Sequence, residues 1–142
     1  MRTLIILMIT FILAYSQPIL GEADTITYEK NVIIYSGNVK ITKANEILTA
    51  DKVTIHLDEN KKASSAEAEG KVFYQDGKRI ARADKAYYDF KKEIIRLVGN
   101  AKVEEGPNFV EADEIIYYRT EGKAVAIGKG KKVRTFYIEE KK

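Results

Sequence analysis

The chain has 142 residues, enough for one domain with its own core and too few for two of ordinary size. Its 24 Lys and Arg against 21 Asp and Glu give a net charge of only +3, which argues against a protein shaped for nucleic acid. With no cysteine and one histidine, His56, the sequence excludes disulfides and makes a zinc site improbable.

The first residues have the layout of a secretory signal peptide. Arg2 precedes an apolar run over residues 4–13, which ends in the small-residue pattern Ala14-Tyr15-Ser16. The run is shorter than the ~20 residues that span a bilayer, so we expect cleavage after Ser16, or alternatively after Gly21. Residues 17–139 are then expected to form a single domain, and residues 140–142 a charged tail.

A repeat organises the rest of the chain. Four glycines open related segments at spacings of 33, 29 and 29 residues: Gly37, Gly70, Gly99 and Gly128. An Ala-Asp pair ends 14 residues after each of the first three, at Asp51, Asp84 and Asp113. Asp24, preceded by Ala23, supplies a partial first unit. The longest unit has its additional residues in the polar stretch 58–65, where an insertion costs little.

Within each unit, apolar and polar residues alternate with a period of two. β-branched and aromatic residues are prominent, and turn signals occur at residues 74–78 and 104–108. This pattern predicts short antiparallel strands, and we find no convincing amphipathic helix beyond the signal segment. The predicted fold class is all-β.

The alternation slips by one residue at each Ala-Asp pair. In LTADKVTIHL, residues 48–57, Leu48 and Ala50 share one strand face, whereas Val53 and the apolar residues after it resume out of step. A β-bulge, or a strand crossing to a second sheet, would produce this slip. Asp can hydrogen-bond backbone at such a joint, and Ala permits close approach. We interpret the repeated carboxylates as structural.

The sequence offers no residues for catalysis. The alternation points His56 to the polar face, no nucleophile-elbow pattern accompanies it, and a lone exposed histidine is weak support for a base or metal ligand. The stretch GKGKKVR, residues 128–134, lacks the spacing of a phosphate loop. We interpret it as a basic hairpin or edge, either a solvated rim or an attractor of phosphates on an anionic ligand. We predict no enzyme, metal or cofactor.

Three stretches carry a family resemblance: YSGNVKITKANEILTADKVTIHL (35–57), LVGNAKVEEGPNFVEADEIIYY (97–118) and KAVAIGKGKKVRTFYI (123–138). Their order and spacing resemble the LptA/OstA family of periplasmic lipopolysaccharide-transport proteins, and QPILGEAD (17–24) is similar to the start of its mature members. The resemblance implies a twisted, open β-jellyroll with an apolar interior, which takes lipopolysaccharide from the inner-membrane transporter and passes it to the outer-membrane assembly complex.

The same resemblance implies partners and their docking edges. Family members associate head to tail, and the ends of the chain pair with an inner-membrane LptC-like and an outer-membrane LptD-like protein. Here the N-terminal edge is expected near Pro18–Tyr28 and the C-terminal edge near Val133–Ile138, where unpaired strands invite strand addition.

An acyl chain of about a dozen CH₂ groups costs on the order of 10 kcal/mol when exposed to water, so a carrier must shield it. By strand phase we expect an apolar groove lined by Ile33, Tyr35, Val39, Ile41, Val53, Ile55, Leu57, Tyr88, Phe90, Ile95, Leu97, Val103, Ile115 and Tyr117. We add Phe73 to this set because the family has an apolar residue after this turn. The alternation alone would also allow Val72 and Tyr74 to face the groove in its place. Ile19 and Ile26 are expected beside the entrance.

Two other interpretations stay open. In one, residues 4–20 are retained as an anchor and the domain is an LptC-like acceptor or scaffold of the same pathway. In the other, the domain is a structural β-module that binds no lipid. The alternating pattern fits a closed sandwich core as well as an open groove.

Overall fold

The computed structural model describes residues 18–139, which form one antiparallel sheet of 10 strands without a helix. The predicted all-β class is therefore confirmed. Within these residues, no helix is long and apolar enough to cross a membrane. The predictions for residues 1–16 and 140–142 lie outside the described part of the chain. The strands are β1 (Ile19–Glu22), β2 (Thr25–Glu29), β3 (Val32–Lys43), β4 (Glu46–Leu57), β5 (Ala63–Asp76), β6 (Arg79–Asp89), β7 (Ile94–Glu105), β8 (Asn108–Tyr118), β9 (Lys123–Ile127) and β10 (Arg134–Phe136).

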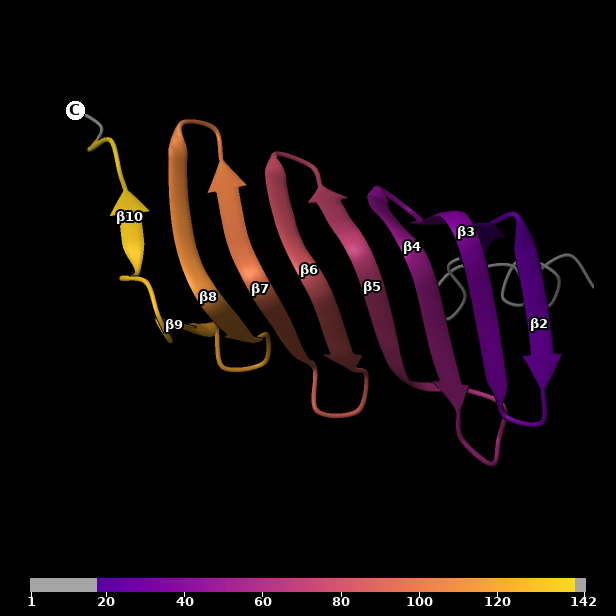
Figure 1. The fold of residues 1–142 in the computed structure, drawn as a ribbon. Helices are drawn as coiled ribbons and strands as arrows, with labels where there is room; N and C mark the ends of the chain where they lie inside the picture. The colour runs from indigo at the N-terminus through magenta and orange to yellow at the C-terminus, as the bar shows by residue number, and fades with distance from the viewer. Residues whose placement is uncertain (1–17, 140–142) are drawn as a thin grey trace, which may run out of the picture.

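From β2 to β9, the strands follow one another across the sheet in chain order, as hairpins whose turns are short. Figure 1 shows this progression from indigo at the N-terminal end to yellow at the C-terminal end. Each end of the sheet is made of two short strands: β1 and β2 both pair with β3, and β9 and β10 both pair with β8. The two expected edges are thus at the ends of the sheet, and β9 adds to the C-terminal one.

A β-bulge interrupts the pairing at the same level of every strand from β3 to β8. Ser36 pairs with Lys52 and Val39 with Ala50, so Gly37 and Asn38 together lie opposite the single residue Asp51. Gly37 has φ +83° and Asn38 has φ +48°, the left-handed geometry of a glycine-type bulge. Of the two explanations given for the slip, the structure supports the bulge, but the extra residue lies in the glycine strand and not in the strand with Ala-Asp.

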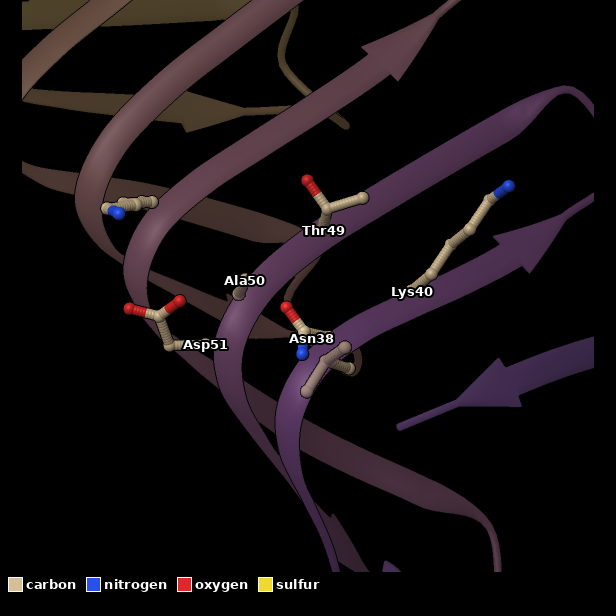
Figure 2. Close-up of a pocket in the computed structure, with 7 residues that line it drawn as sticks. Asn38, Lys40, Thr49, Ala50 and Asp51 are labelled. Atoms are coloured by element: carbon tan, nitrogen blue, oxygen red, sulfur yellow. The ribbon is translucent and has the colours of Figure 1, made fainter. Parts of the chain in front are cut away.

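The bulges bend the sheet across its middle, as Figure 2 shows for β3 and β4 beside Asn38, Ala50 and Asp51. We call the part that includes β2 and β9 the first half-sheet, and the part that includes β1 and β10 the second half-sheet. Because the central strands run through the bend, they are 11–14 residues long, in place of the short strands expected.

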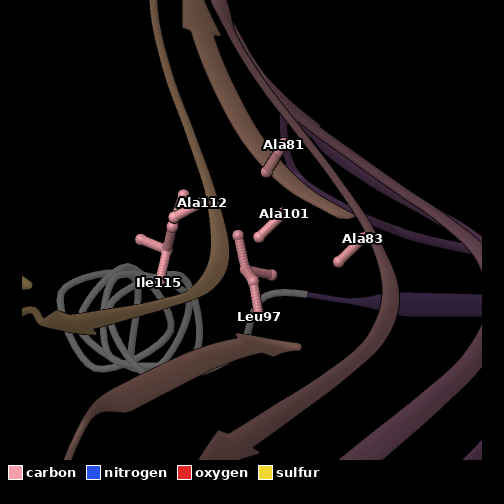
Figure 3. Close-up of a cluster of buried hydrophobic side chains, with 6 residues drawn as sticks. All are labelled: Ala81, Ala83, Leu97, Ala101, Ala112 and Ile115. Atoms are coloured by element: carbon pink, nitrogen blue, oxygen red, sulfur yellow. The ribbon is translucent and has the colours of Figure 1, made fainter. Parts of the chain in front are cut away.

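The buried core follows this bend and consists mainly of small side chains. One cluster joins β3, β4 and β5, and a second joins β6, β7 and β8, where Leu97 and Ile115 gather with four alanines (Figure 3). Six of the eleven buried hydrophobic residues are alanines: Ala50, Ala68, Ala81, Ala83, Ala101 and Ala112. Small residues let the two half-sheets approach closely at the bend, so the fully buried core is a narrow layer there.

Candidate functional site

One face of the sheet, which we call the inner face, carries continuous rows of apolar residues across the strands. In the first half-sheet, paired residues form two neighbouring rows. One row contains Ile26, Tyr35, Val53, Ala68, Ala86, Leu97, Ile115 and Ala126; the next contains Tyr28, Ile33, Ile55, Ala66, Tyr88, Ile95, Tyr117 and Ala124. In the second half-sheet, a row contains Gly21, Ile41, Leu48, Tyr74, Ala81, Val103, Val110 and Thr135.

The strand register puts the lining residues expected from the sequence on this face, Phe73 excepted. Four of them are buried in the core: Val39, Val53, Leu97 and Ile115. Ten are only half-buried: Ile33, Tyr35, Ile41, Ile55, Leu57, Tyr88, Phe90, Ile95, Val103 and Tyr117. Ile19 and Ile26 are exposed at the N-terminal end. The large side chains therefore leave much apolar surface open, in contrast to a closed sandwich core.

Phe73 lies on the opposite, outer face, so its predicted orientation was wrong. It pairs with Thr49 and Arg82, and the Arg82 guanidinium carbon lies 5.3 Å from the centroid of its ring. Val72, only 3% exposed, and Tyr74 point inward and pack with the core clusters. Across the bulge at Gly70, the inner residues of β5 keep their spacing of two, from Ala68 to Val72 and Tyr74, so Phe73 faces outward.

Two polar pairs flank the apolar rows. In the second half-sheet, the Tyr74 hydroxyl donates a hydrogen bond to the Glu46 carboxylate. Burial, and next this bond to Glu46, raise the pKa of the Tyr74 phenol. In the first half-sheet, the Arg119 guanidinium donates a 2.5 Å hydrogen bond to the Tyr88 hydroxyl. Sequence reasoning missed Tyr74 because it chose Phe73 for the inner face, and it missed Glu46 and Arg119 because it followed only apolar residues along strands.

The outer face carries charges that pair across neighbouring strands. Arg82 contacts Glu104 at 3.3 Å, Lys102 contacts Glu104 at 3.0 Å and Glu111 at 3.6 Å, and Arg134 contacts Glu111 at 3.3 Å. His56 is on this face as predicted, and its Nε2 lies 3.8 Å from the Glu67 carboxylate. The surface pocket of Figure 2 lies at the bend and is lined by Asn38, Val39, Lys40, Thr49, Ala50, Asp51 and Lys71. Within residues 18–139, no cluster of His, Cys, Asp or Glu is arranged to hold a metal ion.

The basic stretch at 128–134 connects β9 to β10, and two acidic residues of β8 hold it in place. The Asp113 carboxylate accepts backbone hydrogen bonds from Lys129, Gly130 and Lys131 at 2.5, 2.9 and 3.3 Å. These bonds, that from Lys129 first, lower the pKa of Asp113. Glu114, which is 4% exposed, contacts Arg96 and lies 2.8 Å from the Lys129 ammonium. The stretch is thus a basic edge, as one of the expectations had it, with part of its charge neutralised.

Comparisons with known proteins agree on a family and a fold. Residues 16–123 match the family described as "LptA/(LptD N-terminal domain) LPS transport protein". Among solved structures, the fold is similar to the crystal structure of LptH, the LptA homologous periplasmic component of the conserved lipopolysaccharide transport device from Pseudomonas aeruginosa. The TM-score is 0.76 at 21% identity, over 87% of this chain and 96% of that chain. No curated protein matches the chain.

Proposed function

Because the chain belongs to the LptA/(LptD N-terminal domain) family of lipopolysaccharide transport proteins, which are not enzymes, we propose that its inner face carries the acyl chains of lipopolysaccharide. The protein acts as a carrier in a bridge from the inner-membrane transporter to the outer-membrane assembly complex. The sugars and phosphates of the ligand remain in water, while the chains lie along the apolar rows. No catalytic step is needed for this task.

The proposal depends on one observation: large apolar side chains of the inner face remain partly exposed to solvent. Ten of its large apolar residues are half-buried, although they alternate on the same side as the core. A monomeric protein rarely leaves such continuous apolar surface without a use for it. Covering it with acyl chains is favourable by roughly 25 cal/mol per Å² of apolar surface removed from water. Neither a closed core nor a merely structural module requires this surface.

Photo-crosslinking at two adjacent tyrosines tests the proposal. Tyr88 is on the inner face, whereas Tyr87 faces outward, with the Arg96 guanidinium carbon 5.7 Å from its ring centroid. With benzoylphenylalanine at either position, we expect a lipopolysaccharide adduct at position 88 and little at position 87. Equal adducts at both positions, or none at position 88 in a protein that keeps its thermal unfolding temperature, would contradict the proposal.

The two ends of the sheet support head-to-tail association as the means of building the bridge. The exposed large hydrophobic residues within 18–139 all lie at these ends: Ile19, Leu20, Ile26 and Tyr28 at one, and Val133, Phe136, Tyr137 and Ile138 at the other. β9 and β10 run antiparallel to β8, and β1 and β2 antiparallel to β3, so a second copy added at β9 and β10 continues the antiparallel order. We propose the same two edges for an LptC-like partner and an LptD-like partner.

The strand register specifies which residues would meet at such a joint. Following the paired residues across the sheet, Leu20 of β1 and Phe136 of β10 belong to the same row, as do Glu22 and Arg134. If the next copy keeps the rows continuous, its Leu20 packs beside Phe136 and its Glu22 beside Arg134. The apolar rows of the two copies then join into a longer groove.

We further propose that the protein works in the periplasm after its signal peptide is removed. The match to the family begins at residue 16, next to the expected cleavage site after Ser16. The mass of the protein purified from cells tests this: a chain that begins at Gln17 or, with the alternative site, at Glu22 is expected. A chain that retains Met1 would instead favour the membrane-tethered alternative.

A further inference from the structure

Arg119 differs from the other arginines of the described residues in having no carboxylate partner. Each of the other four has a glutamate oxygen within 4.0 Å: Arg79 with Glu105, Arg82 with Glu104, Arg96 with Glu114 and Arg134 with Glu111. Of the five arginines within residues 18–139, only Arg119 is absent from such pairs. Its charge is therefore available to an anion that the protein does not itself supply.

Arg119 lies at the end of the inner face, beside the apolar rows. It directly follows β8 and continues the alternation of Ile115 and Tyr117 on the inner face, and its backbone N–H donates to the Glu93 carbonyl at 3.0 Å. Its guanidinium bonds to the Tyr88 hydroxyl at 2.5 Å and lies 6.0 Å from the centroid of that ring. Tyr88 is stacked on Phe90 with centroids 4.3 Å apart. A cation thus stands where the apolar rows end.

The carboxylate that acts on the charge of Arg119, that of Glu46, already has a hydrogen-bond partner. Glu46 accepts the hydrogen bond of Tyr74, and its carboxylate is more than 4.0 Å from the guanidinium of Arg119. Burial lowers the pKa of Arg119, but Tyr88, and then Glu46 and Tyr74, outweigh burial, so that the pKa is raised. With Tyr88 occupying one of its five N–H donors, the guanidinium retains a fork that matches two oxygens of a phosphate.

We propose that Arg119, beside the Tyr88 hydroxyl, binds a phosphate group of an anionic lipid whose acyl chains lie on the inner face. This assignment rests on the proposed function and deepens it, since it fixes which end of the inner face receives the headgroup. An arginine–phosphate pair is charge-assisted and directional, so the apolar rows hold the chains while Arg119 sets their orientation. Arg119 is a binding residue for the phosphate, and Tyr88 contacts both its guanidinium and the chains.

Binding of lipid A with and without its phosphates tests the assignment. The wild-type chain and the variants Arg119→Gln, Arg119→Lys and Arg82→Gln are titrated with diphosphoryl lipid A and with the same lipid after removal of both phosphates. We expect Arg119→Gln to weaken binding of the phosphorylated lipid about ten-fold, the usual effect of one hydrogen bond to a charged group. It should leave the dephosphorylated lipid unchanged. Arg119→Lys should lie between, and Arg82→Gln, on the outer face, should match wild type.

Inorganic phosphate alone is the third arm. It should bind wild type far more weakly than the lipid does, because it lacks the chains. Equal binding of phosphorylated lipid A by wild type and Arg119→Gln overturns the assignment and leaves the proposed function standing. The same follows if inorganic phosphate is bound as well as the lipid, since the site is then one for free anions. If wild type binds neither form of lipid A, the proposed function and this assignment fail together. Thermal unfolding of each variant excludes misfolding as the cause of a loss.

Discussion

The side-chain amide of Asn100 donates a 3.0 Å hydrogen bond to the carboxylate of Asp84, across the bulge between β6 and β7. Asn38 and Asp24 make the same bond at 3.0 Å two units earlier in the chain. Asp51 also lies against the glycine that opens the following unit, Gly70. The aspartates Asp24, Asp51 and Asp84 thus each lie at the bulge of a glycine-bearing strand, which makes the repeat a structural device for bending the sheet.

Substitution of Gly99 should show how much the close packing of Asp84 against the bulge contributes to stability. Gly99 has φ +84°, and a Cβ there would lie 2.5 Å from the Asp84 carboxylate. Gly99→Ala should therefore lower the free energy of unfolding by about 2–4 kcal/mol, from backbone strain and the clash together. The matched control is Gly77→Ala, at φ +60° with nothing within 4 Å, for which only about 1 kcal/mol is expected. Urea unfolding of the two variants measures the difference.

The double variant Asp84→Ala/Gly99→Ala distinguishes the clash from the strain. Removing the Asp84 carboxylate should relieve the clash, so the double variant should lose less stability than the two single variants added together. Strict additivity would mean that Asp84 does not define the joint.

Most of the fold could be predicted from the sequence, because the repeat marks the positions of the bulges and the period of two assigns residues to the faces of the sheet. Gly37 and Asp51, with their later copies, mark the bulges, and the period of two assigns Ile33, Ile55 and Ile95 to the inner face. Phe73 was misassigned because three successive residues, Val72, Phe73 and Tyr74, are all apolar, and the earlier inward residues of the same strand are alanines, whose hydrophobic signal is weak. The pairing of Phe73 with Thr49 and Arg82 on the outer face decides its orientation, and such pairing becomes visible only in the folded sheet.

The features that define the candidate site were harder to predict. Alanines such as Ala81 and Ala101 have little hydrophobic signal of their own, yet they are 8% and 1% exposed because the half-sheets meet at the bend. The lack of a carboxylate partner at Arg119 could not be predicted: Arg96, for comparison, contacts Glu114, which is 18 residues away in sequence. Pairing of charges over such separations becomes visible only when the strands are placed in space.

Core and open residues of the inner face should respond differently to substitution. Leu97 is 7% exposed and packs in the core cluster with Ile115, so Leu97→Ala should cost about 2–4 kcal/mol of stability. Ile33 is half-buried, so Ile33→Ser should cost about 1 kcal/mol but weaken binding of lipopolysaccharide, because it places a hydroxyl in the apolar row. Chemical unfolding and lipid titration of both variants check this. A large stability loss for Ile33→Ser, with unchanged binding, would argue for a closed core.

Acid should release the C-terminal edge through Asp113. Backbone hydrogen bonds, that of Lys129 first, lower the pKa of Asp113 in the folded chain. A lowered pKa contributes stability above the unfolded value of about 3.9, and this stability is lost as the pH falls through the folded pKa. Asp113→Asn should therefore be less stable than wild type at pH 6, and the difference should shrink at pH 3. Urea unfolding at the two pH values measures it; a difference that stays constant would exclude the carboxylate as the anchor.

The register at the proposed joint makes a prediction that the cysteine-free chain is well suited to test. Leu20 and Phe136 belong to one row, and Thr135 belongs to the neighbouring row on the opposite face. In an antiparallel joint, residues directly opposite one another have Cβ atoms about 4.5–5.5 Å apart, close enough for a disulfide after small adjustments. The double variant Leu20→Cys/Phe136→Cys should therefore form a ladder of disulfide-linked oligomers on mild oxidation. Leu20→Cys/Thr135→Cys should not, because its second thiol points to the other face. If the ladders are equal in both, or if the second variant alone forms one, the copies meet in a different register, and the rows of the inner face do not run continuously from one copy into the next.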